Sequence, residues 1–203
     1  MAYAVSPSDD TITKGQSGKF SDLLAAALAK SGLPNTETQQ VLEQQGANLT
    51  AQFIALVRGQ VDAVSEIIRR SVPVDRDMSP EAAISATGRT QYVMADVVAS
   101  MPQGVDDTAE IIWIPLKKRM SNEEVVKKLA GYEMILVDPI ALSAHNALEP
   151  DFAAKQRNFT LWQDAEGNWC YAAFYDWSDV RFVRVTWHVL DWDGDWWVAA
   201  VRK

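Results

Sequence analysis

The hydrophobic residues in the first third of the chain recur with the period of an α-helix. Leu28 belongs to the apolar face of a predicted helix that begins near Ser17 and ends at Gly32. A short helix follows and reaches Gly46, and the pattern then continues as one long helix over residues 48–70. This part of the sequence predicts helices and no strands.

Apolar residues of the long helix are spaced alternately by three and four positions. They form a heptad seam over two repeats: Ile54, Val57, Val61, Val64 and Ile68. Two interpretations fit this seam. The shorter helices could fold back onto it as a three-helix unit, or a second copy of the chain could cover part of it. We therefore expect residues 18–71 to form a helical oligomerisation module, after a disordered tail over residues 1–17.

The next segment, residues 72–104, predicts a small helical linker region. Ser79 is a favoured N-cap residue, and Pro80 suits the first position of a helix. A second short helix is expected over residues 95–101, with the sequence ADVVASM. Two short helices joined by a turn superficially resemble a DNA-binding motif, but this second helix has no basic or amide side chain to read base edges.

Residues 105–203 predict a domain that mixes strands and helices. A strand over residues 110–118 precedes a helix that opens with the capping box from Ser121 to Glu124. Residues 132–137 look extended, and Asp138 with Pro139 begins a further helix. The sequence leaves open whether the 132–137 segment joins the sheet.

From Phe159 onward the pattern is typical of β-strands joined by short turns. Four strands are expected, and the pair Asp193-Gly194 is a strong hairpin signal before the last one. The predicted fold class is therefore α+β, with an N-terminal helical module followed by a mixed domain. That domain contains a Trp-rich, four-stranded antiparallel meander.

The strand over residues 169–177 alternates between two kinds of side chain. One face has an aromatic ladder that consists mainly of Trp169, Tyr171, Tyr175 and Trp177, and the other face is mostly small and apolar. The ladder could build the core of the sheet. Alternatively, it could be an exposed platform for a sugar ring, a peptide or another protein.

Composition and charge limit the classes of function. A chain of 203 residues with 48% hydrophobic residues can bury a core, which excludes intrinsic disorder. The net charge of −8 argues against binding to nucleic acid or to an anionic membrane. We expect no membrane span and, because MAYAVSPSDD lacks the features of a secretion signal, a cytoplasmic location.

No motif in the sequence supports a catalytic or metal site. Cys170 is the single cysteine, and the acids from Asp191 to Asp195 lack the oxygen series of a calcium-binding loop. We therefore assign no catalytic residue, no metal ligand and no cofactor. A small hydrolase with an unrecognised site near His145 or His188 is kept as a second alternative.

Several stretches together resemble a known family: SATGRTQYV, VVASMP, SNEEVVKKL, DPIALSAHNALEPDFA and WQDAEGNWCYAAFYDW. They are similar to a multi-copy family of short hypothetical proteins from ultra-small candidate-phylum bacteria. The resemblance covers nearly the whole chain and implies a recurring small module of cytoplasmic type. It implies no activity, substrate or catalytic residue.

The sequence thus favours a non-enzymatic interaction or assembly protein. We expect a homo-oligomer, with a dimer favoured, that self-associates through its N-terminal helices and binds a protein partner through its C-terminal domain. The alternative is a module that binds carbohydrate or the cell envelope with an aromatic face of the sheet.

Overall fold

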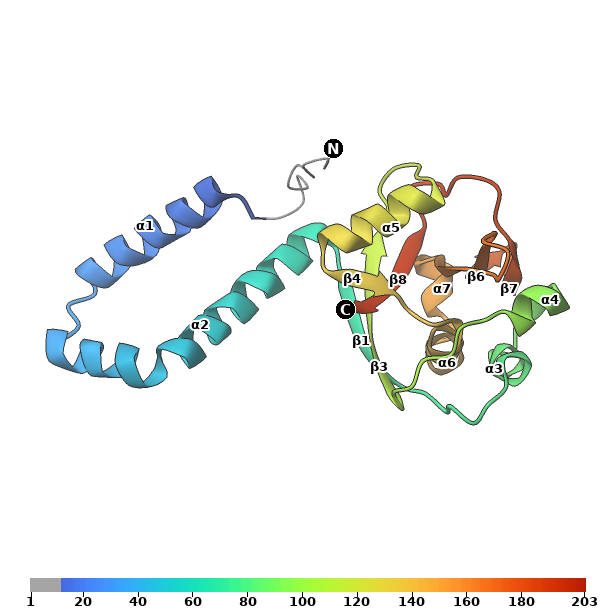
Figure 1. Ribbon diagram of the computed structural model, residues 1–203, viewed down its shortest axis with the longest axis horizontal. Coiled ribbons are helices and arrows are strands. Elements are labelled where there is room, and N and C mark those ends of the chain that lie inside the picture. The colour runs from blue at the N-terminus through green and yellow to red at the C-terminus, as the bar shows by residue number, and fades with distance from the viewer. Residues whose placement is uncertain (1–11) are drawn as a thin grey trace. The chain divides into compact units, whose positions relative to one another are not determined.

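The computed structural model describes residues 12–203 and has the α+β fold that the sequence predicts (Figure 1). The chain divides into two compact units between Val64 and Ser65. Helices make up the first unit, and a mixed sheet with five helices makes up the second. Within residues 12–203, no helix is long and apolar enough to cross a membrane.

From residue 12 onward, the N-terminal unit consists of two helices, α1 (Lys14–Lys30) and α2 (Asn35–Ser65). A capping box at Thr13 starts α1, so the chain is already helical within the stretch predicted as a disordered tail; residues 1–11 lie outside the described part. Gly32 adopts a positive φ of 69° in the turn between the helices, a conformation that glycine adopts at little cost.

The expectation of three helices in this unit is wrong. Gly46 lies inside α2, so the two helices predicted on either side of it are one continuous helix. The helix also ends earlier than expected, because Glu66 takes a left-handed φ of 64° and the chain turns into a strand at Ile68. None of the described side chains in this unit is buried.

The C-terminal unit is built on one mixed sheet in the order β1-β3-β8-β5-β6-β7-β2, with β4 also paired to β8. Its strands are β1 (Ile68–Pro73), β2 (Thr90–Val93), β3 (Thr108–Pro115), β4 (Met134–Leu136), β5 (Asn158–Gln163), β6 (Trp169–Trp177), β7 (Val180–Trp187) and β8 (Trp197–Arg202). Its helices are α3 (Pro80–Ala86), α4 (Ala95–Ala99), α5 (Asn122–Gly131), α6 (Pro139–Leu148) and α7 (Phe152–Lys155).

Three helices of this unit begin at the N-caps that the sequence predicts. The side chains of Ser79, Ser121 and Asp138 accept hydrogen bonds from backbone N–H groups in the first turns of α3, α5 and α6, respectively. Ser121 and Glu124 form the full capping box. Local capping chemistry therefore fixes the starts of these helices, independently of the sheet.

The segment over residues 72–104 is part of this unit rather than a linker. Its helices α3 and α4 bury Ile84 and Val97 in the hydrophobic core beside the sheet. Its extended stretch, β2, pairs in parallel with β7. The helices and the strand of this segment are short, which is why its sequence suggests a linker.

The predicted four-stranded meander is correct for three strands and wrong for the fourth. Strands β5, β6 and β7 pair antiparallel in sequence order, but β8 returns to the far side of β5 and pairs with it in parallel. The residues between β7 and β8 form a crossing loop, in which the ring of Trp192 is buried and stacks on Phe159 with centroids 3.6 Å apart. Gly194 of this loop approaches the backbone of Lys118 so closely that a Cβ atom would lie 2.8 Å from its nitrogen. Asp193-Gly194 therefore serves a close approach and not a hairpin.

The segment predicted as extended over residues 132–137 does join the sheet. Strand β4 pairs antiparallel with β8, as β3 does on the opposite side of β8. Strands β3 and β4 thus run parallel to each other with β8 between them, and α5 lies in the connection. The connection through α5 therefore gives the sheet two parallel strands, β3 and β4, that do not pair with each other.

The two faces of the sheet are covered to different extents. One face carries a core with α3, α4, α6 and α7, to which Phe174 and Val183 contribute. The other face carries a second core with α5 and the crossing loop, centred on Phe159. Helix α5 packs beside β4, so the side chains of Tyr92 and Tyr175, on β2 and β6, are left exposed or half-buried.

Candidate functional site

A cleft of about 770 Å³ lies over the part of the sheet that α5 does not cover. We call it the aromatic cleft, because rings from three strands and the crossing loop line most of it. These rings belong to Tyr92, Tyr171, Tyr175, Trp177, Phe182, Trp187, Trp192 and Trp196. Contiguous exposed apolar surface of this kind often marks a binding site.

Three of the rings form a row across neighbouring strands. Tyr175 on β6 lies directly opposite Phe182 on β7, and the ring centroids are 5.6 Å apart at an interplanar angle of 31°. Tyr92 on β2 continues the row, 5.7 Å from Phe182 at 40°. Trp196 closes one end, with its edge toward Tyr175 at 5.8 Å and 73°. The row is a platform of rings that are tilted by 31° and 40° to one another, with an upright ring beside it.

The crossing loop supplies a wall of stacked rings. His188 stacks on Trp192, with centroids 4.3 Å apart at 14°, and meets the edge of Tyr171 at 5.2 Å. Burial lowers the pKa of His188 to about 4, although the charge of Asp191 acts in the opposite direction. The imidazole is therefore neutral at pH 7, and this wall offers ring surface without a positive charge.

Charged groups lie within and around the platform. Arg184 is exposed and pairs in register with Ala173 of β6 and Tyr92 of β2. Arg157 lies over the ring of Trp196 at 5.4 Å and forms an ion pair with Asp195 at 3.2 Å. The aromatic cleft thus combines stacking surface with charged hydrogen-bonding groups of both signs.

The aromatic ladder predicted from the sequence is divided between different environments. Trp177 is 65% exposed and Tyr175 is half-buried, and both line the aromatic cleft. Tyr171 is buried in its floor. Trp169 lies outside the aromatic cleft, half-buried, where its indole N–H donates to a carboxylate oxygen of Glu123 at 2.7 Å.

The sequence interpretation missed Tyr92, Phe182 and Trp196. Phe182 could have been found from the hairpin register, because it faces Tyr175 once the two-residue turn between β6 and β7 is fixed. Tyr92 reaches the row only through a parallel pairing between strands far apart in sequence, which leaves no local signal.

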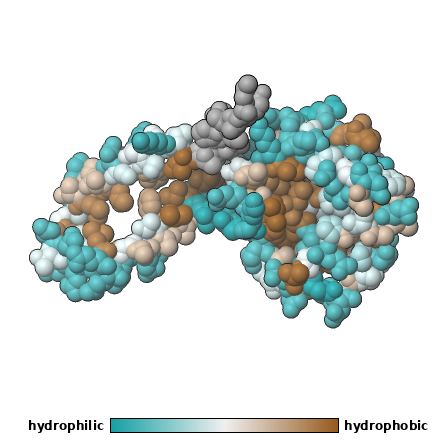
Figure 2. Space-filling view, in the orientation of Figure 1, coloured by the Kyte–Doolittle hydropathy of each residue, from teal (hydrophilic) through white to brown (hydrophobic). Residues whose placement is uncertain are grey.

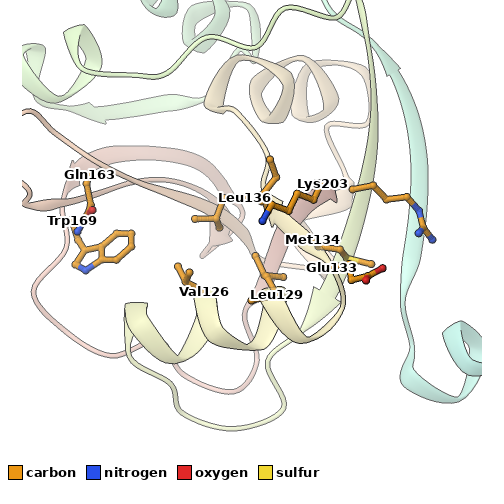
Figure 3. Close-up of a pocket in the computed structure, with 11 residues that line it drawn as sticks. Val126, Leu129, Glu133, Met134, Leu136, Gln163, Trp169 and Lys203 are labelled. Carbon is orange, nitrogen blue, oxygen red and sulfur yellow. The ribbon is translucent and has the colours of Figure 1, made fainter. Parts of the chain in front are cut away.

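A second pocket, of about 830 Å³, lies between α5 and β4 (Figure 3). Val126 and Leu129 of α5 lie on one side of it near Leu136 of β4, and Trp169 lies across from them (Figure 3). Its lining mixes apolar side chains with charged ones and brings together no row of rings. We therefore regard the aromatic cleft as the better candidate for a binding site.

The predicted self-association seam is exposed over its helical part. Ile54, Val61 and Val64 are exposed on α2, and Val57 is half-buried. Ile68 does not belong to the seam, because it lies in β1 opposite Trp113 and packs against the core of the C-terminal unit.

Figure 2 shows how apolar residues gather on the N-terminal unit. They lie on the sides of α1 and α2 that face each other, and the outer sides are largely polar (Figure 2). The rings of Phe20 and Phe53 meet edge to face at 5.7 Å between the two helices. The apolar faces are therefore turned inward yet stay accessible to solvent.

The geometry gives little support to a hydrolase. His145 is wholly buried between the rings of Trp113 and Phe152, at 4.8 and 4.7 Å, and burial lowers its pKa to about 4. The Ser143 hydroxyl donates to the Pro139 carbonyl and is buried as well. Burial also raises the pKa of the Cys170 thiol, which makes it a poorer nucleophile. Over the described residues, no three His, Cys, Asp or Glu side chains are grouped to hold a metal ion.

Comparison of the chain with protein-family models, curated proteins and solved structures finds no match.

Proposed function

We propose that this protein is a non-enzymatic assembly protein that self-associates through its N-terminal helices and binds a protein partner through its C-terminal unit. One observation carries the first half of the proposal. The two helices expose large apolar side chains along their length, such as Leu23 at 61% and Leu56 at 63%, and bury none of the described residues.

Physical arguments favour a second copy of the chain as the missing cover. Burying a Leu, Val or Phe side chain contributes about 1.5–3 kcal/mol, and most helical stability in proteins comes from such packing. Residues 12–64 contain four basic and four acidic side chains, so two copies would not repel each other. Two helical pairs could interleave their inward apolar faces as a four-helix arrangement.

Charge placed on the seam tests this proposal. We expect the full chain to be a dimer or larger at about 50 µM in sedimentation velocity, and Ile54→Asp with Val61→Asp to weaken association at least about tenfold, since buried charges are costly. The matched control is Gln45→Asp with Gln52→Asp, which has the same seven-residue spacing on the opposite side of the helix. A wild-type chain that stays monomeric at several hundred micromolar would refute self-association.

A second candidate function is carbohydrate binding in the aromatic cleft. The row of Tyr92, Phe182 and Tyr175 favours it, because pyranose rings stack on aromatic side chains. Arg184 and the pair of Arg157 with Asp195 lie beside the row and could bond to sugar hydroxyls. A glycan would use this platform without any change in the sheet.

Titration calorimetry with a panel of neutral and acidic oligosaccharides tests the second candidate. Binding should fall at least about tenfold in Tyr175→Leu, which removes a ring of the platform at similar volume. Tyr132→Leu is the control, because Tyr132 is half-buried against the core centred on Phe159 and does not line the aromatic cleft. Absence of heat across the whole panel would count against this function.

A further inference from the structure

The arginines of the C-terminal unit differ in whether an acid neutralises them. Within the described residues, Arg184 forms no ion pair and no side-chain hydrogen bond, and its guanidinium lies over no aromatic ring. Six of the nine arginines in residues 65–203 do pair with a carboxylate: Arg70, Arg76, Arg89, Arg119, Arg157 and Arg181. Arg184 is exposed, so its guanidinium is free to bind a group from outside the chain.

The position of Arg184 is the middle of the ring surface in the aromatic cleft. It lies in register with one residue of β6 and one of β2, and residues in register share a face of the sheet. Residues two positions away on β7 share that face as well, because side chains alternate along a strand. The neighbours of Arg184 on this face are all uncharged: Tyr92, Tyr171, Ala173, Tyr175, Phe182 and Thr186.

The acids that line the aromatic cleft lie in the crossing loop and not on its strands. They are Asp191, which forms an ion pair with Arg119 at 3.1 Å, and Asp193, which is exposed. The charge of Arg184 extends to the floor of the aromatic cleft, because it acts to lower the pKa of Tyr171 while burial, the larger effect, raises it. The strands therefore carry one positive charge among rings, and no acid beside it.

An exposed guanidinium among rings suits a ligand that carries a carboxylate next to a ring of its own. Arginine binds a carboxylate through two parallel N–H···O bonds, and hydrogen bonds between ionised groups are roughly twice as strong as neutral ones. The ring of such a ligand would stack on Tyr175 and Phe182 while its carboxylate reaches Arg184. Both features of the surface would then be used at once.

The floor of the aromatic cleft favours a saccharide over a peptide. Strand β7 pairs with β6 along its whole length and with β2 over residues 182–185, so the backbone groups of this floor are used within the sheet. A peptide laid on this face would bring amide groups that only side chains could satisfy, whereas peptides are usually recognised through backbone pairing. Sugar hydroxyls both donate and accept, and side chains and water can satisfy them.

We propose that the aromatic cleft binds an acidic oligosaccharide, and that Arg184 selects it by pairing with the carboxylate of a hexuronate unit. This inference rests on carbohydrate binding, the second candidate function, and names the class of sugar. Tyr175 and Phe182 supply the stacking surface, and Arg184 is the specificity-determining residue. A neutral sugar gains the stacking alone.

Titration calorimetry of the full chain with matched sugars tests the proposal. The probes are oligosaccharides of galacturonate, of glucuronate and of mannuronate, each compared with its own methyl ester, which has the same rings and no charge. At least one acid should bind about tenfold or more tightly than its ester, because only the acid can pair with the guanidinium. The difference should shrink as the salt concentration rises.

Variants of the arginine assign the effect to one side chain. Arg184→Gln removes the charge and should weaken binding of the acid at least about tenfold, so that acid and ester bind alike. Arg184→Lys should fall between the two, because an ammonium keeps the charge and loses the paired donors. The matched control is Arg181→Gln on the same strand: Arg181 pairs with Asp151, does not line the aromatic cleft, and its loss should leave binding unchanged. Unchanged tryptophan emission verifies that each variant is folded.

Three results would overturn the proposal. In the first, every acid binds no more tightly than its ester, or Arg184→Gln leaves that preference intact. In the second, the peptide acetyl-Glu-Tyr-Glu-Tyr-Glu-amide binds through Arg184 as tightly as the best acid, which would assign the aromatic cleft to an acidic protein segment. In the third, Arg184→Gln weakens self-association in sedimentation without sugar, which would place Arg184 against a second copy of the chain.

Failure of this inference can be separated from failure of carbohydrate binding itself. If sugars bind and lose affinity in Tyr175→Leu, but show no preference for the acid, only the role of Arg184 is refuted. If no acid and no ester gives heat, both are refuted. Self-association through the helices is measured independently, by sedimentation of the same samples.

Discussion

The two units of this protein differ in how far they bury their apolar side chains. The C-terminal unit buries large residues such as Phe159 and Phe174 completely, in two cores on either side of one sheet. The N-terminal unit has comparable residues, including Phe20 and Phe53, yet none of its described side chains is buried. Hydrophobic content alone therefore does not distinguish a core from a surface that is available to a partner.

Geometry explains the difference. A sheet with helices on both faces offers each apolar side chain several neighbours, as the stack of Phe159 on Trp192 illustrates. Two helices joined by a short turn give each other a single neighbour, and here the rings of Phe20 and Phe53 meet edge to face between them. Further helices are needed to complete such a layer.

Removing one phenylalanine from each unit should give the largest contrast. Phe159→Ala deletes a fully buried ring and should lower the free energy of unfolding of the C-terminal unit by about 3–5 kcal/mol. Phe53→Ala deletes a ring that is 36% exposed and should change that free energy by less than about 0.5 kcal/mol. Urea unfolding followed by tryptophan emission measures both, because all eight tryptophans lie between residues 113 and 197.

The two variants should exchange rank when self-association is measured. Phe53→Ala should raise the dissociation constant of the oligomer, and Phe159→Ala should leave helix association intact in mild conditions. Equal loss of unfolding free energy in both variants would contradict the separation into a self-sufficient unit and a partner-dependent one.

The buried histidine should make the C-terminal unit sensitive to acid. Burial lowers the pKa of His145 in the folded protein to about 4, with Glu149 and Arg70 acting in opposite directions, whereas its ordinary value is 6.5. Between these two pH values His145 binds more protons in the unfolded chain than in the folded one. Its contribution to the free energy of unfolding is therefore fully present above pH 6.5 and is lost as the pH falls toward 4. The loss from this group should reach up to about 3 kcal/mol, at 1.36 kcal/mol per pKa unit.

Comparison with His145→Phe isolates that contribution, since the carboxylates titrate in both proteins. Urea unfolding at pH 7, 5 and 4 should show a smaller loss of stability in the variant, whose ring can pack between Trp113 and Phe152. Parallel curves for the two proteins would mean that His145 is already paired or solvated in the folded state.

Local signals in the sequence predicted the elements of the C-terminal unit well. The N-caps Ser79, Ser121 and Asp138 and the strand over residues 169–177 depend on neighbours within a few positions, and they are confirmed. The position of β8 depends instead on a long-range contact, the buried stack of Trp192 on Phe159. The local signal at residues 193–194 predicted a hairpin there and gave no indication of that contact.

The candidate site was predictable only where one strand defines it. Alternation along β6 identified Tyr175 and Trp177 as sharing a face. The sequence could not indicate that Tyr171 is covered by the crossing loop, since that depends on long-range contacts with His188 and Trp192. Tyr92 joins the row through a parallel pairing, for which no short-range pattern exists.

The smallest effect compares the same capping device in the two units. Thr13 with Gln16 caps α1, and Ser121 with Glu124 caps α5, each through a full capping box. Ser121→Ala should lower the unfolding free energy of the C-terminal unit by about 1 kcal/mol, because α5 unfolds together with the sheet. Thr13→Ala should leave that free energy unchanged and reduce only the helical circular dichroism of dilute, dissociated protein. If Thr13→Ala shifted tryptophan-detected unfolding as far as Ser121→Ala does, α1 would have to unfold with the sheet, and the helices would owe their stability to the C-terminal unit rather than to another copy.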